Sequence, residues 1–208
     1  MSFDFDGVDD RVGFGSPTEF DNAEPFTALV WMAPDTLGES SNGRVFAKES
    51  GASLAGWLFL TMNTATGAGP RLIFTKNYAT TNLQVQIAGG SIRTDGTFQH
   101  VALSWDGSAT ATNVKIYVNG VEAAYTGQTN GTGAKQSDAA LTFNLGNRDE
   151  RSRTFDGRMA HAHFFRRVLT QAEIQMLMWH PASLGPQTNA GANTGGLVAY
   201  WPLDTTAL

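Results

Sequence analysis

The chain contains no cysteine among its 208 residues. Disulfide bridges and thiolate metal sites are therefore excluded, which suits folding in a reducing cytosol and leaves stability to packing. Charged residues are also scarce, at 16%, against a usual value of about 25%. The surface must then present mainly uncharged polar groups, and the 23 glycines, with many threonine, asparagine and serine residues, are types that turns require.

Long basic runs and long apolar runs are missing as well. No run of lysine and arginine exceeds two residues and the net charge is −5, so nucleic acid is not an expected partner. No apolar stretch approaches the length of a membrane span, and residues 1–6 lack the basic and apolar regions of a signal peptide. We therefore expect no membrane partner and synthesis in a cytoplasm, from which the chain leaves only through assembly or lysis.

What the sequence does contain is a series of short runs rich in β-branched and aromatic residues, separated by Gly, Asn, Asp and Pro. The predicted strands are 26–32, 44–48, 57–62, 71–75, 83–87, 101–105, 114–118, 141–146, 158–165 and 197–201. So many short strands are typical of a β-sandwich or barrel. The length fits one such unit, so we predict a single domain over residues 1–208.

Residue spacing indicates how these strands are buried and joined. Phe26, Ala28, Val30 and Met32 alternate with other residues, which places all four on one face of a strand. Asn119-Gly120 separates two strand-like runs and favours a type I′ hairpin turn. The segments 63–70, 126–138 and 183–196 are predicted to be loops because they are rich in Gly, Thr and Asn.

One helix is predicted near the C-terminus. Thr170 and Glu173 have the spacing of a capping box, an apolar stripe follows, and Pro181 ends the helix. We expect this helix to cover one end of the sandwich.

Six segments resemble, in order, the laminin-G-like, concanavalin A-like lectin/glucanase superfamily. They are FDGVDDRV (5–12), FTALVWMAP (26–34), FQHVALSWDG (98–107), VKIYVNGV (114–121), LGN to FDGR (145–158) and VLTQAEI (168–174). The resemblance covers nearly the whole chain and implies a jelly-roll of two antiparallel sheets. It does not determine function, because the fold serves lectins, adhesion modules, glycanases and virion proteins.

Two departures from the family pattern carry information. The segment GLVAYWPLD (196–204) resembles the strand that usually opens such domains, yet here it closes the chain. This order is similar to that of laminin-G-like structural proteins of tailed bacteriophages. At Ala160 and His161 the family commonly has an Asp-Glu pair, which this chain lacks.

The chain is not expected to be an enzyme. Members of the superfamily that hydrolyse β-glucans carry Glu-x-Asp-x-x-Glu on one strand, which places the nucleophile and the acid on one face. This sequence contains no such motif.

Two metal sites are considered. The carboxylates of Asp6, Asp9, Asp10 and Asp156 are oxygen ligands that suit a structural Ca²⁺, although aspartates in such turns also accept backbone hydrogen bonds without a metal. His161 and His163 are two residues apart on a predicted strand, on one face with Met159 and Phe165, and could hold a transition metal. Without a third ligand in the sequence, ordinary structural histidines are the favoured interpretation.

Binding residues are sought among aromatic and arginine side chains. Trp57, Trp105 and Trp201 lie in apolar strands and are expected in the core, so Tyr78, in a polar loop, is the predicted stacking platform for a sugar. Arg148, Arg151 and Arg153 lie in a mixed-charge loop that is predicted either to contact a partner or to pair internally.

Two functions follow from these observations. The first is a non-enzymatic virion protein of a tailed phage, decorating the capsid or forming part of a fibre, with capsid or tail proteins and further copies of itself as partners, and with possible adhesion to surface glycans. The alternative is a cellular carbohydrate-binding lectin module. Calcium is the only cofactor expected under either hypothesis.

Overall fold

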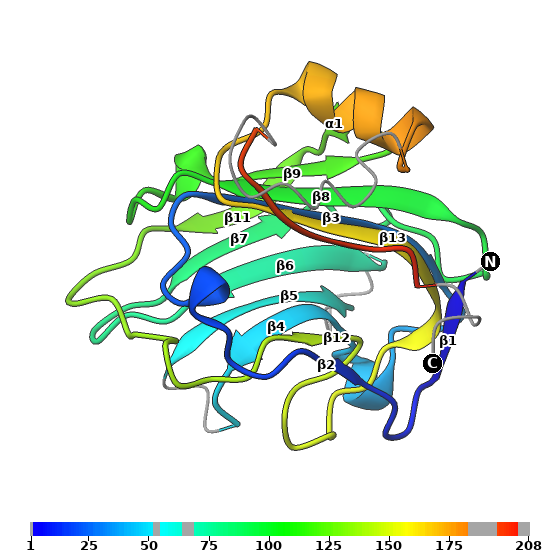
Figure 1. Ribbon diagram of the computed structural model, residues 1–208, viewed down its shortest axis with the longest axis horizontal. Helices are drawn as coiled ribbons and strands as arrows, with labels where there is room; N and C mark the ends of the chain where they lie inside the picture. The colour runs from blue at the N-terminus through cyan, green and yellow to red at the C-terminus, as the bar shows by residue number, and fades with distance from the viewer. Residues whose placement is uncertain (1, 52–54, 64–68, 183–194, 204–208) are drawn as a thin grey trace.

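The computed structural model describes residues 2–51, 55–63, 69–182 and 195–203. Two antiparallel sheets face each other across an apolar interior, and the one α-helix of these residues lies outside them (Figure 1). The predicted all-β, jelly-roll-like sandwich with a single short helix is confirmed. No helix of the described residues is long and apolar enough to cross a membrane.

The two sheets contain seven strands each. Sheet A has the order β1 (Phe3–Asp6), β13 (Asp156–Phe165), β3 (Phe26–Pro34), β8 (Gln99–Trp105), β9 (Lys115–Val118) and β10 (Val121–Glu122), with β14 (Leu197–Trp201) also paired to β13. Sheet B has the order β11 (Tyr125–Thr129), β7 (Leu83–Ile87), β6 (Arg71–Lys76), β5 (Gly56–Met62), β4 (Arg44–Glu49), β12 (Asn144–Leu145) and β2 (Val12–Gly13). Short 3₁₀ turns lie at Thr18–Phe20, Glu39–Ser41 and Ala111–Asn113.

The interior between the sheets is built by the predicted alternation. The side chains of Phe26, Ala28, Val30 and Met32 are all buried in it, as the spacing of two residues requires. Trp57 and Trp105 are 1% and 0% exposed, so the prediction that they lie in the core is confirmed. Asn119 and Gly120 both have positive φ angles, 49° and 75°, which is the backbone geometry of the predicted type I′ turn.

One expected loop contains a strand. β11 lies within the segment 126–138 except for its first residue, and it pairs with β7 at the edge of sheet B. Its sequence, YTGQT, is mostly exposed and polar, so it lacks the alternating apolar residues by which the other strands are predicted. The backbone hydrogen bonds of β7 determine its conformation.

The strands β1 and β14 lie end to end along β13. β14 pairs with residues 162–165 of β13, and β1 pairs with residues 156–159, both antiparallel. Two segments from opposite ends of the sequence therefore share one edge position of sheet A (Figure 1). The segment 197–201 is a strand, as predicted, and it lies end to end with β1.

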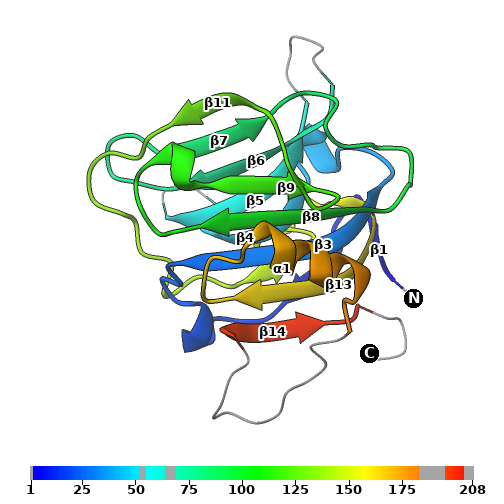
Figure 2. The ribbon, with the colours of Figure 1, turned by 90° about the horizontal axis from the view of Figure 1, so that it is seen from above.

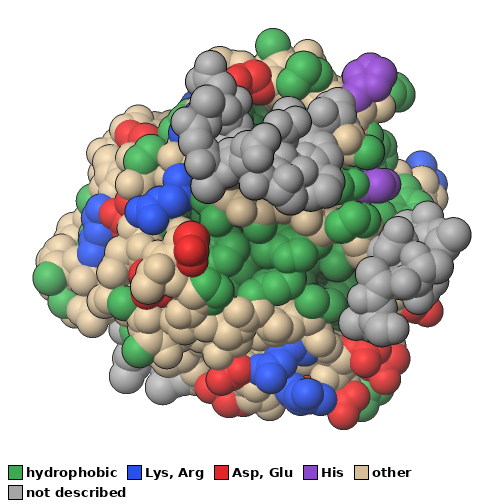
Figure 3. Space-filling view, in the orientation of Figure 1, with side chains coloured by type: hydrophobic (Ala, Val, Ile, Leu, Met, Phe, Trp, Pro, Cys, Tyr) green, Lys and Arg blue, Asp and Glu red, His purple; other side chains and the backbone are tan. Residues whose placement is uncertain are grey.

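Hydrophobic side chains remain visible between the sheets on the side that Figure 3 shows. Here the edge of sheet A at β14 lies opposite the edge of sheet B at β2. The rings of Phe14 and Trp201 stack across this gap with centroids 4.2 Å apart, and both side chains are half-buried. Trp201 therefore packs against the core from its rim rather than from within it.

The helix α1 (Gln171–Trp179) covers the outer face of sheet A (Figure 2). The expectation that it covers an end of the sandwich is wrong. Two of its three buried side chains, Ile174 and Leu177, pack on Leu29, Ala102 and residues of β9 and β13. The helix buries an apolar patch on the outer face of sheet A, which stabilises its position. The residues of that patch alternate along the strands with those that face the core.

Candidate functional site

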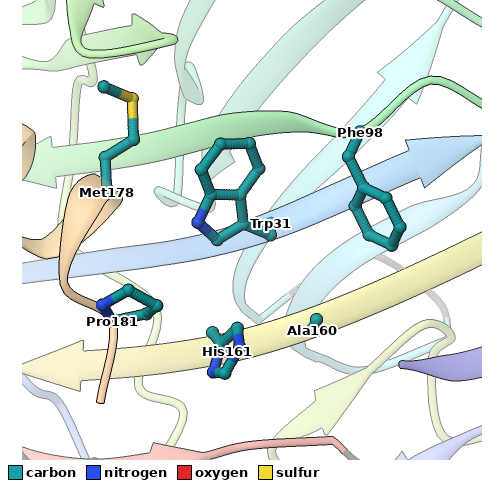
Figure 4. Close-up of a pocket in the computed structure, with 6 residues that line it drawn as sticks. All are labelled: Trp31, Phe98, Ala160, His161, Met178 and Pro181. Atoms are coloured by element: carbon teal, nitrogen blue, oxygen red, sulfur yellow. The ribbon is translucent and has the colours of Figure 1, made fainter. Parts of the chain in front are cut away.

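A pocket of about 340 Å³ lies on the outer face of sheet A, beside the last turn of α1. Its size is within the range of small-molecule sites. The lining side chains come from β3, the residue before β8, β13, the end of α1 and the segment that follows it (Figure 4). They belong to Trp31, Phe98, Ala160, His161, Met178 and Pro181.

The capping box at its N-terminus holds α1 in place. The side chain of Thr170 accepts a hydrogen bond from the Glu173 N–H, and the Glu173 carboxylate accepts one from the Thr170 N–H, as predicted. Hydrogen bonds from the Arg167 guanidinium lower the pKa of Glu173 to about 2, so this cap stays ionised. The helix ends at Trp179, which brings Met178 and Pro181 to the wall of the pocket.

A β-bulge in β13 shapes the floor of the pocket. The pairing of β13 with β3 shifts between Ala160 and His163, and His161 has a φ angle of 52°. Such an extra residue bends a strand and is common beside functional sites. The bulge inverts the alternation, so Met159 faces the core between the sheets while Phe165 packs under α1. The prediction that both residues share a face with the histidines is therefore wrong for Met159, whereas the Phe165 ring does stack beside His163, with centroids 6.3 Å apart.

Two aromatic rings give the pocket its stacking surfaces. The half-buried Trp31 ring contacts His100 edge to face, with centroids 5.4 Å apart. Phe98 is 38% exposed, and the Arg158 guanidinium lies over its ring, 5.1 Å from the centroid. The Arg158 side chain also donates a hydrogen bond of 2.9 Å to the Gly96 carbonyl. Neighbouring side chains thus hold both rings before any ligand arrives.

The histidines near the pocket are held by hydrogen bonds and by burial. The Nδ1 atom of His161 lies 2.7 Å from the Tyr200 hydroxyl. His163 is fully buried, with its ring nitrogens 3.1 Å and 2.9 Å from the carbonyl oxygens of His161 and Pro181. Burial lowers the pKa of His163 to about 4 and that of His100 to about 3, so both rings are neutral near pH 7, and His163 donates to only one of the two carbonyl oxygens. These partners support structural roles for the histidine pair rather than metal binding.

Three of the four predicted calcium ligands meet in one turn. Oxygen atoms of Asp6, Asp9 and Asp10 lie within 4.8 Å of one another, a spacing that suits oxygens around Ca²⁺ at about 2.4 Å. One oxygen of Asp6 accepts hydrogen bonds from the N–H groups of Val8 and Asp9, and one of Asp10 accepts from the Asp6 N–H. The hydrogen bond from Val8 lowers the pKa of Asp6 below its usual value. The aspartates therefore build the turn themselves, and calcium stays a prediction.

Asp156 is placed differently from those three. Its backbone pairs with that of Asp6, but its carboxylate accepts a 2.6 Å hydrogen bond from the Thr36 hydroxyl. It is not part of the close group of carboxylates among the described residues.

The Tyr78 side chain is buried rather than exposed. It is 6% exposed and packs beside Gly131, and the backbones of Tyr78 and Thr81 form bridges with residues 135 and 132. Burial raises the pKa of its hydroxyl to about 12. The prediction that Tyr78 is an exposed platform is wrong, because the segment after β11 covers it.

The arginine loop is largely paired with itself. The Arg148 guanidinium donates to the Ser152 hydroxyl and to the Gly51 carbonyl, and Arg153 donates to the Ser152 carbonyl. Arg151 is exposed at a positive φ angle of 50°. This pattern matches the internally paired alternative for the loop, and its contact with a partner stays a prediction.

Sequence reasoning passed over Trp31 and Phe98. A signal for Trp31 exists, because it alternates with the core-facing Val30 and Met32 and so had to point outward. Both family departures, Ala160 and His161, also line the pocket. Without the position of α1, however, no rule connects these residues.

Comparison with known proteins identifies the family of the fold. Residues 6–175 match the family model Laminin_G_3, described as the concanavalin A-like lectin/glucanases superfamily. Among curated proteins, none matches the chain.

Several solved structures share the fold. A candidate carbohydrate-binding protein from Bacteroides ovatus ATCC 8483 superposes with a TM-score of 0.63 and 17% identity, over 99% of this chain and 52% of that one. This chain thus spans about half the length of that protein. The CBM40 domain of the Ruminococcus gnavus IT-sialidase, bound to α2,3-sialyllactose, superposes with a TM-score of 0.55 and 16% identity, over 86% of this chain and 98% of that domain. The heptameric SAP-like pentraxin from Limulus polyphemus superposes with a TM-score of 0.52 and 13% identity, over 95% of this chain and 93% of that one.

Proposed function

Because this chain belongs to the concanavalin A-like lectin/glucanase superfamily, we propose that it is a non-catalytic carbohydrate-binding domain. The observation that carries the proposal is the pocket beside α1, with the rings of Trp31 and Phe98 in its wall. Aromatic faces stack on the apolar C–H faces of sugar rings, and a concave site with preset side chains lowers the entropic cost of binding.

The composition of the pocket supports binding rather than hydrolysis. Glycoside hydrolysis uses two carboxyl groups about 5–9.5 Å apart across the scissile bond. Among the described residues that line the pocket, none is an aspartate or a glutamate. His161, which lies 2.7 Å from the Tyr200 hydroxyl, can contact a sugar hydroxyl.

Two structural neighbours lend further support. The R. gnavus domain was solved with a sialylated glycan, and the B. ovatus protein is described by a carbohydrate-binding role. At these identities the likeness extends to the fold alone. The glycan that this chain binds has to follow from its own pocket.

A glycan array followed by calorimetry tests the proposal. We expect the purified chain to bind a defined subset of glycans, and Trp31→Ala to weaken that binding by about tenfold or more. Trp179→Ala is the matched control, because Trp179 is 72% exposed and does not line the pocket. Absence of glycan binding, or equal loss in both variants at unchanged thermal stability, would overturn the proposal.

A second proposal concerns where such a domain works. We propose a virion role in a tailed phage, as capsid decoration or fibre component, with capsid or tail proteins and further copies of the chain as partners. This proposal rests on the resemblance of residues 196–204 to the strand that usually opens such domains. The end-to-end arrangement of β14 and β1 supports it, because residues 197–201 form a strand next to the start of the domain. Mass spectrometry of purified particles from the source tests it: fixed copy number per particle is expected, and absence from particles contradicts it. The comparisons favour the carbohydrate-binding proposal over this one.

A further inference from the structure

The pocket beside α1 contains few groups that can form hydrogen bonds. Of the six described residues that line it, only Trp31 and His161 have side-chain nitrogen atoms, and none has a side-chain oxygen. An unmodified hexose carries hydroxyl groups on nearly all of its carbons, and a hydroxyl that is buried without a partner is disfavoured. The lining therefore suits a sugar that turns an apolar substituent toward the protein.

The position of Ala160 provides room for such a substituent. Ala160 is the cross-strand partner of Trp31, and its side chain is a single methyl group. In Figure 4 it lies between Phe98 and His161 on β13, on the outer side of the sheet. A larger residue here would fill the space beside the indole ring, whereas alanine leaves the rings of Trp31 and Phe98 accessible from that side.

The remaining polar groups are placed to orient a sugar rather than to surround it. The His161 ring is fixed by the 2.7 Å contact with the Tyr200 hydroxyl. Among the described residues, none accepts a hydrogen bond from the Trp31 indole N–H, which can therefore donate to a ligand oxygen. The side chains of Trp31 and His161 can hydrogen-bond to one or two oxygens of a ligand. The rest of the lining is apolar, so it must contact apolar atoms of the ligand.

Building on the proposed carbohydrate-binding function, we infer that the ligand is a methyl-bearing sugar. The methyl group belongs either to the acetamido group of an N-acetylhexosamine or to C6 of a 6-deoxyhexose. In both cases the methyl group enters the space over Ala160, between the rings of Trp31 and Phe98. The pyranose ring then lies against the aromatic faces, with its hydroxyl groups toward solvent.

Matched pairs of sugars that differ at the methyl group test this inference. N-acetylglucosamine is compared with N-formylglucosamine, and L-fucose with L-galactose, by saturation-transfer difference NMR and by titration. We expect at least one methyl-bearing sugar to bind about tenfold more tightly than its partner, which is typical for one methyl group in an apolar pocket. Its methyl protons should receive the strongest saturation. The two pairs show which source of the methyl group the pocket accepts.

Variants make the result specific to the pocket. Ala160→Leu should abolish the preference for the methyl group, because the new side chain fills its space, while Trp179→Ala should preserve it. If sugars bind in a Trp31-dependent manner but each pair binds within about twofold, this inference is overturned and the proposed function stands. If no glycan binds, both are overturned. A preference that survives Ala160→Leu in a folded protein places the methyl group elsewhere and overturns the inference.

Discussion

The Nδ1 atom of His161 and the hydroxyl oxygen of Tyr200 are 2.7 Å apart, and the two rings are nearly parallel, at 3°. His161 stands in the bulge of β13, and Tyr200 stands in β14. The contact therefore connects the C-terminal strand to the floor of the pocket. It fixes the orientation of a ring that the strained backbone alone would leave less defined.

Removing this hydroxyl should affect binding more than folding. Tyr200→Phe leaves the ring and removes the hydroxyl that lies 2.7 Å from His161 Nδ1, so we expect glycan affinity to fall by about two- to tenfold, the equivalent of one hydrogen bond. The free energy of unfolding should change by less than about 1 kcal/mol, because Tyr200 is half-buried at an edge strand. Calorimetry and urea denaturation measure the two effects, and unchanged affinity would show that the orientation of His161 does not matter.

Stability should fall on mild acidification because of two buried histidines. Burial lowers the pKa of His100 to about 3 and that of His163 to about 4, below the 6.5 of an unfolded histidine. The unfolded chain therefore takes up protons first, so stability is complete above about pH 6.5 and is lost as the pH falls toward 4 and 3. We expect a loss of about 4 kcal/mol between pH 7.5 and pH 5 from the two residues, measured by urea denaturation.

His100→Leu separates the two contributions. Neither ring nitrogen of His100 has a hydrogen-bond partner among the described residues, so the variant should be no less stable than the natural chain at pH 7.5. It should also lose about half of the pH dependence. An unchanged pH dependence would contradict the assignment of the effect to His100.

Lys48 is a buried charge whose loss should be severe. Its side chain is 0% exposed, and Nζ donates hydrogen bonds to the Asp21 carboxylate at 2.9 Å and to the carbonyl oxygens of Asp138 and Leu141. Lys48→Met removes the buried cation from all three acceptors and leaves the Asp21 carboxylate without its counter-charge, so we expect a loss of about 3–5 kcal/mol in the free energy of unfolding. Urea denaturation at neutral pH measures it.

Lys115→Met is the matched control for that change. Lys115 pairs with Glu122 at 2.9 Å, but the two side chains are 40% and 36% exposed. Solvent screens such a pair, so its loss should cost less than about 1 kcal/mol. Equal losses in the two variants would contradict a role for burial.

Calcium at the N-terminal turn can be tested by thermal unfolding. If Ca²⁺ binds the carboxylates of Asp6, Asp9 and Asp10, a concentration 100 times Kd should stabilise the fold by about 2.7 kcal/mol and raise the melting temperature. Asp9→Asn should abolish this shift, whereas Asp4→Asn, at an exposed position of β1, should preserve it. A melting temperature that does not respond to millimolar calcium would rule the site out.

Local rules predict most of this fold. The alternation of Phe26, Ala28 and Val30 determines which side of β3 is buried, and Asn119-Gly120 determines the hairpin turn. The Thr170–Glu173 capping box determines where α1 begins. In each case the cause lies within a few residues of the effect, so the sequence displays it directly.

The pocket could not be predicted in this way, because its causes are not local. A bulge at Ala160 and His161 leaves the apparent alternation from Met159 to Phe165 intact, so the reversal of faces is invisible in the sequence. The outward direction of Trp31 follows from the alternation of side chains along β3. Its place beside α1, however, depends on packing between segments that are distant in the sequence. The burial of Tyr78 depends likewise on the chain that follows β11.

The most direct test of glycan binding at the pocket is an NMR titration that observes the indole N–H signals of a ¹⁵N-labelled chain, with Trp31 assigned through Trp31→Phe. On addition of the glycan that binds most tightly on the array, we expect the Trp31 signal to move while those of the buried Trp57 and Trp105 stay in place. A glycan that binds and leaves the Trp31 signal unchanged would contradict this expectation.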